Sequence, residues 1–88
     1  MRLELKKFGL VLTSRPAGKE AYLAAKAYSL PKDEQEKIEI DFDGVQVLTP
    51  SWADEFLTPL FKDYPGRVVL LPTHNATVKA TLEIIKIN

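Results

Sequence analysis

The sequence contains no cysteine, a single histidine and only four glycines in 88 residues. Without cysteine there is neither a disulfide nor a thiolate metal site. One histidine excludes a histidine-based metal cluster, and the scattered glycines form no loop that cradles phosphate. Lysine plus arginine and aspartate plus glutamate number twelve each, so no net charge attracts nucleic acid or an anionic membrane. We therefore expect no metal, no cofactor, no nucleic acid and no membrane partner.

The length and the apolar content predict one small domain over residues 1–88. The hydrophobic fraction is 45% and the charged fraction 27%, which are ordinary values for a soluble globular protein. No run approaches the roughly 18 apolar residues that span a bilayer, and residues 1–7 alternate without the apolar core of a signal peptide. We expect a cytoplasmic protein whose oligomeric state the sequence does not indicate.

The N-terminal half predicts two short strands and a helix. Residues 2–6 alternate polar and apolar side chains, and residues 10–12 are apolar, which favours a hairpin. Ser14 is a suitable cap for a helix that ends near Leu30-Pro31, and Gly18 lowers its stability by about 1 kcal/mol relative to alanine. The apolar stripe expected to be buried on this helix comprises Ala17, Ala21, Ala24, Ala25 and Tyr28.

The C-terminal half predicts a charged loop over residues 32–37, a strand over 38–42, and then two helices separated by a strand over 67–71. The first of these helices starts near Ser51 and is kinked or shortened by Pro59. The second follows Thr73-His74-Asn75. The predicted order is β-β-α-β-α-β-α, an α/β fold with a four-stranded mixed sheet and helices mainly on one face.

In this topology the second, third and fourth strands end at one edge of the sheet, and all three helices begin there. Helix N-termini present unpaired N–H groups and a positive dipole end, so this edge is the expected ligand edge. The side chains gathered there are Thr13, Ser14, Arg15, Thr49, Ser51, Trp52, Asp54, Thr73, His74 and Asn75.

Three of these side chains have two interpretations each. Ser51 and Asp54 match a capping box, and Ser51 is also a suitable phosphoacceptor at a helix start. Trp52 either covers the rim of the core or anchors another protein. Arg15 pairs with Asp54 or Glu20, or it holds an anion.

The remaining polar candidates favour structural roles. His74 as a lone histidine after a strand is more often a loop or helix-start hydrogen bonder than a catalytic base. Asp41 and Asp43 are too few for a metal site, and Asp43-Gly44 is typical of a turn. No motif for catalysis is present, so we expect no enzyme.

The segment IEIDFDGVQVLTPSWADEFL, residues 38–57, resembles the centre of a STAS domain, as found in bacterial anti-sigma factor antagonists. Their signature Asp-Ser-Ser-Gly, whose second serine is phosphorylated, aligns with Thr49-Pro50-Ser51-Trp52, so only Ser51 matches. A closer resemblance is to a small STAS-like family of unknown function, whose pattern is similar to IDFDGV, to the Ser-Trp-Ala-Asp-Glu that follows it, and to the earlier segment FGLVLTSRPAGKEAY. Its members often occur near or fused to histidine-kinase-like ATPase domains.

The resemblance implies a non-enzymatic signalling module that binds a histidine-kinase-like ATPase or an anti-sigma-type kinase. Ser51 is then the candidate phosphoacceptor, and the candidate contact residues are Arg15, Thr49, Trp52, Asp54, Thr73, His74 and Asn75. The alternative is a small-anion or nucleotide-binding domain that uses the helix N-termini at the same edge.

Overall fold

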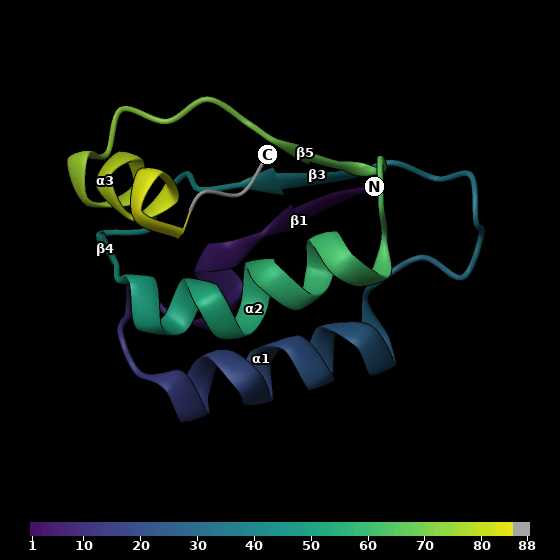
Figure 1. The fold of residues 1–88 in the computed structure, drawn as a ribbon, viewed down its shortest axis with the longest axis horizontal. Helices are drawn as coiled ribbons and strands as arrows, with labels where there is room; N and C mark the ends of the chain where they lie inside the picture. The colour runs from purple at the N-terminus through teal and green to yellow at the C-terminus, as the bar shows by residue number, and fades with distance from the viewer. Residues whose placement is uncertain (86–88) are drawn as a thin grey trace.

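A computed structural model describes residues 1–85 of the chain as a small α/β fold (Figure 1). Its helices and strands are β1 (Arg2–Glu4), the 3-10 helix η1 (Leu5–Phe8), β2 (Val11–Leu12), α1 (Arg15–Tyr28), β3 (Ile38–Asp41), β4 (Val47–Leu48), α2 (Pro50–Asp63), β5 (Val68–Leu70) and α3 (Ala76–Ile85). None of the helices in this described part is long and apolar enough to cross a membrane.

The main sheet has the strand order β1-β3-β5, and both pairings are parallel. The period-two pattern places Leu3, Ile38 and Ile40 on the helix side, where all three are fully buried. The opposite face carries charged side chains: Arg2 Nε lies 3.8 Å from Glu39 Oε1, and Arg2 Nη1 lies 3.9 Å from Asp41 Oδ2. The expected one-sided sheet is therefore confirmed.

The predicted hairpin between the first two strands is wrong. After β1 the chain makes the helical turn η1 and passes through Gly9 (φ 134°), so the connection from Leu5 to Leu10 is longer than a hairpin loop. This detour carries β2 away from β1, and β2 pairs instead with β4, again in parallel. The strands thus form sheets of three and two rather than one mixed sheet of four, and β4 lies in an apolar run too short to show a strand pattern.

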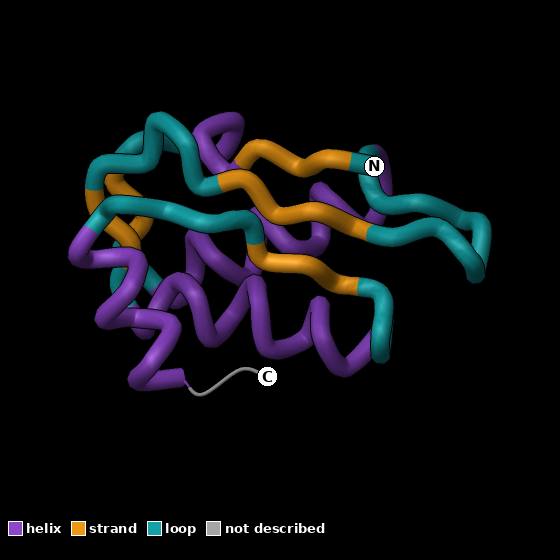
Figure 2. The backbone as a smooth tube through the Cα atoms, turned by 90° about the horizontal axis from the view of Figure 1, so that it is seen from above, coloured by secondary structure: helices purple, strands orange, loops and turns teal. Residues whose placement is uncertain are grey.

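Helices α1 and α2 lie on the same face of the main sheet, with α2 between the sheet and α1 in Figure 1, and Figure 2 shows both behind the strands. The face that α1 buries differs from the one expected, because Ala17, Ala24 and Tyr28 are exposed. Gly18 instead lies against α2, where a Cβ would stand 2.5 Å from the Trp52 carbonyl oxygen. This close approach rotates α1 so that its buried residues are Gly18, Ala21, Tyr22 and Ala25.

Helix α2 supplies the centre of the core. Its side chains Trp52, Phe56, Leu57 and Leu60 are at most 1% exposed. Pro59 lies inside the helix, which continues to Asp63, so of the two predicted effects, a kink or a shortening, the shortening does not occur. Helix α3 packs against α2 and β4 beyond the end of the main sheet.

Candidate functional site

All three helices begin at the end of the molecule toward which the strands of the main sheet point, as Figures 1 and 2 show. We call this end the helix-start edge. Ser14 caps α1 as expected, because its hydroxyl accepts a hydrogen bond of 3.3 Å from the Ala17 amide. The three helix N-termini therefore lie together at one edge, as predicted.

Arg15 joins α1 to the first turns of α2. Its Nη1 donates to Asp54 Oδ2 at 2.9 Å and to Glu55 Oε2 at 3.0 Å, while the Thr58 hydroxyl donates to Asp54 Oδ1 at 2.9 Å. The hydrogen bonds from Arg15 and Thr58 hold the pKa of the Asp54 carboxyl below its ordinary value, and the two carboxylates raise the pKa of Arg15. We call these four residues the Arg15 cluster. Of the two predicted partners, Asp54 is confirmed and Glu20 is replaced by Glu55.

Ser51 lies in the first turn of α2, as predicted, but it does not cap the helix. The cap is Thr49, in an extended conformation (φ −102°, ψ 158°), because a residue before proline is driven out of the helical region and Pro50 suits the first helical position. The Thr49 hydroxyl donates to the Thr13 carbonyl at 2.8 Å, and Asp54 belongs to the Arg15 cluster. The predicted capping box is therefore wrong.

The half-buried Ser51 hydroxyl makes no hydrogen bond within residues 1–85. Asp54 and Glu55 follow Ser51 by three and four residues, the spacing that places helical side chains on one face. A charge added to Ser51 is thus close to the carboxylates that hold Arg15.

Trp52 is a core residue, which corrects its assignment as a contact residue. Only 1% of it is exposed, and its indole stacks on Phe56 with ring centroids 4.9 Å apart and planes 14° apart. Phe8 packs beside it at 6.2 Å. Trp52 therefore sets the position of its neighbours Ser51 and Asp54 without reaching a partner itself.

The second group at the helix-start edge surrounds the beginning of α3. Asn75 caps this helix, since its Oδ1 accepts from the Thr77 amide at 2.8 Å and from the Val78 amide at 3.1 Å. Its Nδ2 donates to the Val45 and Gln46 carbonyls, both at 2.9 Å. Both polar atoms of the Asn75 side chain thus form hydrogen bonds within the protein, which favours a structural role over ligand binding.

Thr73 and His74 flank a small cavity at the same edge. The Thr73 hydroxyl accepts a hydrogen bond of 3.1 Å from the Asn75 amide, and the His74 side chain is exposed. The cavity has a volume of about 240 Å³ and is lined by residues 42–45 and 72–75. No hydrogen bond or ion pair within residues 1–85 joins this group to the Arg15 cluster, so the predicted edge consists of two separate groups.

Comparison with known families identifies the fold family. Residues 26–88 match the family described as STAS-like domain of unknown function, DUF4325. The chain belongs to this family. The match begins within α1, so the resemblance of residues 8–22 to the same family lies outside it. No curated protein and no solved structure matches the chain.

In this STAS-like domain α3 is held on β4 by two threonines that sequence reasoning missed. The Thr81 hydroxyl donates to the Leu48 carbonyl at 2.6 Å, and Thr77 Oγ1 accepts from the Leu48 amide at 3.2 Å. They complete the hydrogen bonds of a strand that has a strand neighbour on one side only. The signal in the sequence is a threonine on an otherwise apolar helical stripe, and Thr81 is indeed only 2% exposed.

The two aspartates before Gly44 serve a turn, as predicted. Asp41 Oδ1 accepts from the Asp43 amide at 2.9 Å, and Gly44 adopts φ 86°. Within residues 1–85 no group of three or more histidine, aspartate or glutamate side chains is arranged to hold a metal ion.

Proposed function

We propose that this STAS-like domain is a non-enzymatic regulatory module that binds another protein through the Arg15 cluster and Ser51. The observation that carries the proposal is the position of Ser51: a hydroxyl without a protein partner in the first turn of α2, beside the exposed ion pairs that join α1 to α2. A helix N-terminus accommodates a phosphate well, so modification there does not unfold the helix.

The partner we propose is a cytoplasmic histidine-kinase-like ATPase or anti-sigma-type kinase, as the STAS resemblance suggests. Phosphorylation of Ser51 adds up to two negative charges next to Asp54 and Glu55. This addition competes for the Arg15 guanidinium and repels an acidic partner surface, so we propose that the unmodified form binds and the phosphorylated form is released.

The test uses wild type, Ser51→Ala and Ser51→Glu as baits in the presence and absence of ATP, followed by calorimetry with the purified ATPase that is captured. Gln35→Glu is the matched control, because it adds the same charge in the exposed loop after α1, at the opposite end. We expect wild type, Ser51→Ala and the control to bind alike and Ser51→Glu to lose binding. Equal binding by all four proteins would refute the switch, and the absence of any captured partner would refute the binding module.

The cavity beside α3 supports a second candidate, a small-anion or nucleotide site at the helix-start edge. Its position before the N-terminus of α3 favours negative charge, although Asn75 already occupies two of the amides in the first turn. A specific ligand raises the melting temperature by mass action, so a thermal shift screen with phosphate, sulfate and nucleotides tests it. An unchanged melting temperature with every compound would remove this candidate.

A further inference from the structure

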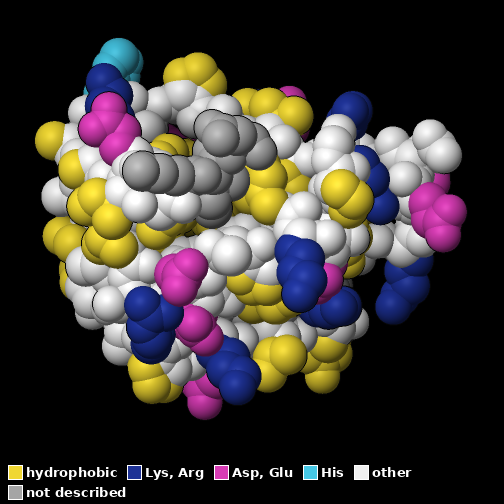
Figure 3. Space-filling view, viewed as in Figure 1, with side chains coloured by type: hydrophobic (Ala, Val, Ile, Leu, Met, Phe, Trp, Pro, Cys, Tyr) yellow, Lys and Arg dark blue, Asp and Glu magenta, His cyan; other side chains and the backbone are white. Residues whose placement is uncertain are grey.

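A second cavity lies at the opposite end of the molecule from the helix-start edge. It has a volume of about 460 Å³, within the range of small-molecule sites, and lies between the C-terminal ends of α1 and α2 and the loop that follows α1. The residues that line it are Lys26, Leu30, Pro31, Lys32, Glu34, Asp63, Tyr64 and Arg67. Figure 3 shows lysine and arginine side chains at this end of the molecule (right).

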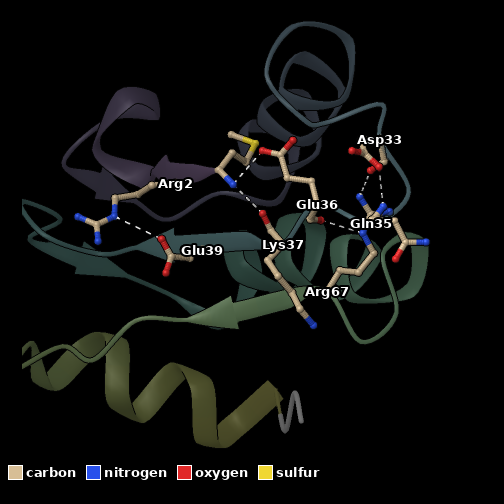
Figure 4. Close-up of polar contacts among 8 residues, drawn as sticks. Arg2, Asp33, Gln35, Glu36, Lys37, Glu39 and Arg67 are labelled. Atoms are coloured by element: carbon tan, nitrogen blue, oxygen red, sulfur yellow. Dashed lines mark hydrogen bonds and ion pairs between the residues drawn. The ribbon is translucent and has the colours of Figure 1, made fainter.

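Arg67 is the central cation of this cavity, and it has no acidic partner within residues 1–85. Its Nε donates to the Glu36 carbonyl at 2.9 Å and its Nη2 to the Asp33 carbonyl, as Figure 4 shows. Its guanidinium carbon lies 5.1 Å from the centre of the Tyr64 ring. Two of its five N–H groups are thus used, both by neutral carbonyls, and a partly buried positive charge is left without a carboxylate.

Two of the acidic groups nearby are engaged elsewhere, whereas the exposed Glu34, which also lines the cavity, forms no ion pair or hydrogen bond within residues 1–85. Asp63 accepts a hydrogen bond of 2.6 Å from the Tyr22 hydroxyl and forms an ion pair of 3.2 Å with Lys26. Glu36 forms an ion pair of 3.0 Å with the Met1 amine. Lys32, by contrast, forms no ion pair or hydrogen bond within residues 1–85. Among the lining residues Lys26 is paired with Asp63, so the charges of Arg67 and Lys32 are opposed only by Glu34 and the cavity keeps a net positive charge.

We propose that this cavity binds a small organic oxyanion, a phosphate or carboxylate carried on an apolar group. The charged group lies between Arg67 and Lys32, because the free N–H groups of a guanidinium fit two oxygens of such an anion. The apolar group packs against Leu30, Pro31 and Tyr64. The C-terminal ends of α1 and α2 each act like about half a negative charge and so repel an anion, but this effect falls off within one helical turn. Arg67 and Lys32 each carry a full positive charge, which outweighs it.

This site is independent of the proposed function, since it shares no residue with the helix-start edge. The test is an amide NMR titration with phenyl phosphate and with benzoate, which distinguishes the two oxyanions, and with phenol as the neutral control. We expect saturable shifts at the amides of residues 30, 32–34, 64, 66 and 67 with one or both anions and none with phenol.

The variant that reports on the site is Lys32→Gln, because the exposed Lys32 side chain forms no hydrogen bond or ion pair within residues 1–85 that the substitution would remove. We expect it to weaken anion binding about tenfold, the loss of one charge-assisted hydrogen bond. Lys19→Gln, an exposed position of α1 that does not line the cavity, leaves binding unchanged. No saturable shift at millimolar anion, shifts confined to the helix-start edge, or equal weakening by both variants would each overturn the proposal.

Discussion

Replacing Gly18 by alanine tests the contact that brings α1 and α2 together. Alanine is favoured over glycine in a helix interior by about 1 kcal/mol, so helix propensity alone predicts that the variant is more stable. The structure predicts the opposite sign. The added Cβ would stand 2.5 Å from the Trp52 carbonyl oxygen, 3.1 Å from the Trp52 Cα and 3.2 Å from the Glu55 Cβ.

The clash is severe because two of these three neighbours are backbone atoms of α2, which cannot rotate away as a side chain can. The helices must therefore separate, and overpacking of this kind costs about 1–3 kcal/mol or more. After subtraction of the gain in propensity we expect Gly18→Ala to lower the free energy of unfolding by up to about 2 kcal/mol. For a domain of this size that is a fall in melting temperature of up to about 16 °C.

Urea denaturation and calorimetry measure the effect, with Ala24→Gly as the control for propensity on the exposed face of α1. Separation of the helices also draws Arg15 away from Asp54, so the carboxyl pKa of Asp54 rises toward its ordinary value in Gly18→Ala. A variant that is more stable than wild type would refute the close packing of α1 on α2.

Three further predictions concern side chains that hold the helices in place. Asn75→Ala should lower the free energy of unfolding by about 1–3 kcal/mol in urea titrations, because it removes a helix cap and two bonds to carbonyls; an unchanged midpoint contradicts this. Trp52 fluorescence should be blue-shifted and should not change when a partner binds, whereas a red-shifted spectrum would place the indole in water. The Asp63 carboxyl accepts hydrogen bonds from Tyr22, which has the larger effect, and from Lys26, and both hold its pKa below the ordinary value. The stabilisation that these bonds give is therefore fully present above the ordinary pKa and is lost as the pH falls through the lower pKa of the folded state. Tyr22→Phe should therefore raise this pKa in NMR titrations and reduce the loss of stability in acid, and an unmoved pKa would show that Tyr22 is not its main cause.

Local patterns in the sequence predicted much of the fold. The alternation of residues 38–42 identified β3 and its buried face, and the Ser14 cap located the start of α1. The shared edge of the three helix starts followed from the order of elements alone. These features depend on a few consecutive residues and on handedness, which a sequence expresses directly.

The features that failed depend on contacts between distant residues. The face that α1 buries is decided by the approach of Gly18 to Trp52, and the two-residue strand β4 exists because β2 and the threonines of α3 supply its hydrogen bonds. The start of α2, by contrast, has a local signal, because proline is typical of the first position of a helix. Pro50 therefore indicates a cap at Thr49 rather than at Ser51.

The candidate site was predicted in part for the same reason. Arg15 and Asp54 were paired correctly, since both lie at helix starts. The cavity around Arg67 combines segments from about residue 26 to 34 and from 63 to 67, and no local pattern connects them. Its charge balance becomes visible only when the partners of each carboxylate are known.

The most direct test of the central claim is the affinity of the proposed ATPase partner, once purified, for Ser51→Glu, measured by calorimetry beside wild type and Gln35→Glu. We predict that Ser51→Glu binds at least about tenfold more weakly, a difference of about 1.4 kcal/mol, while the control binds like wild type. Equal affinities for all three proteins would contradict a switch at Ser51 and would leave the Arg15 cluster as a structural contact between two helices.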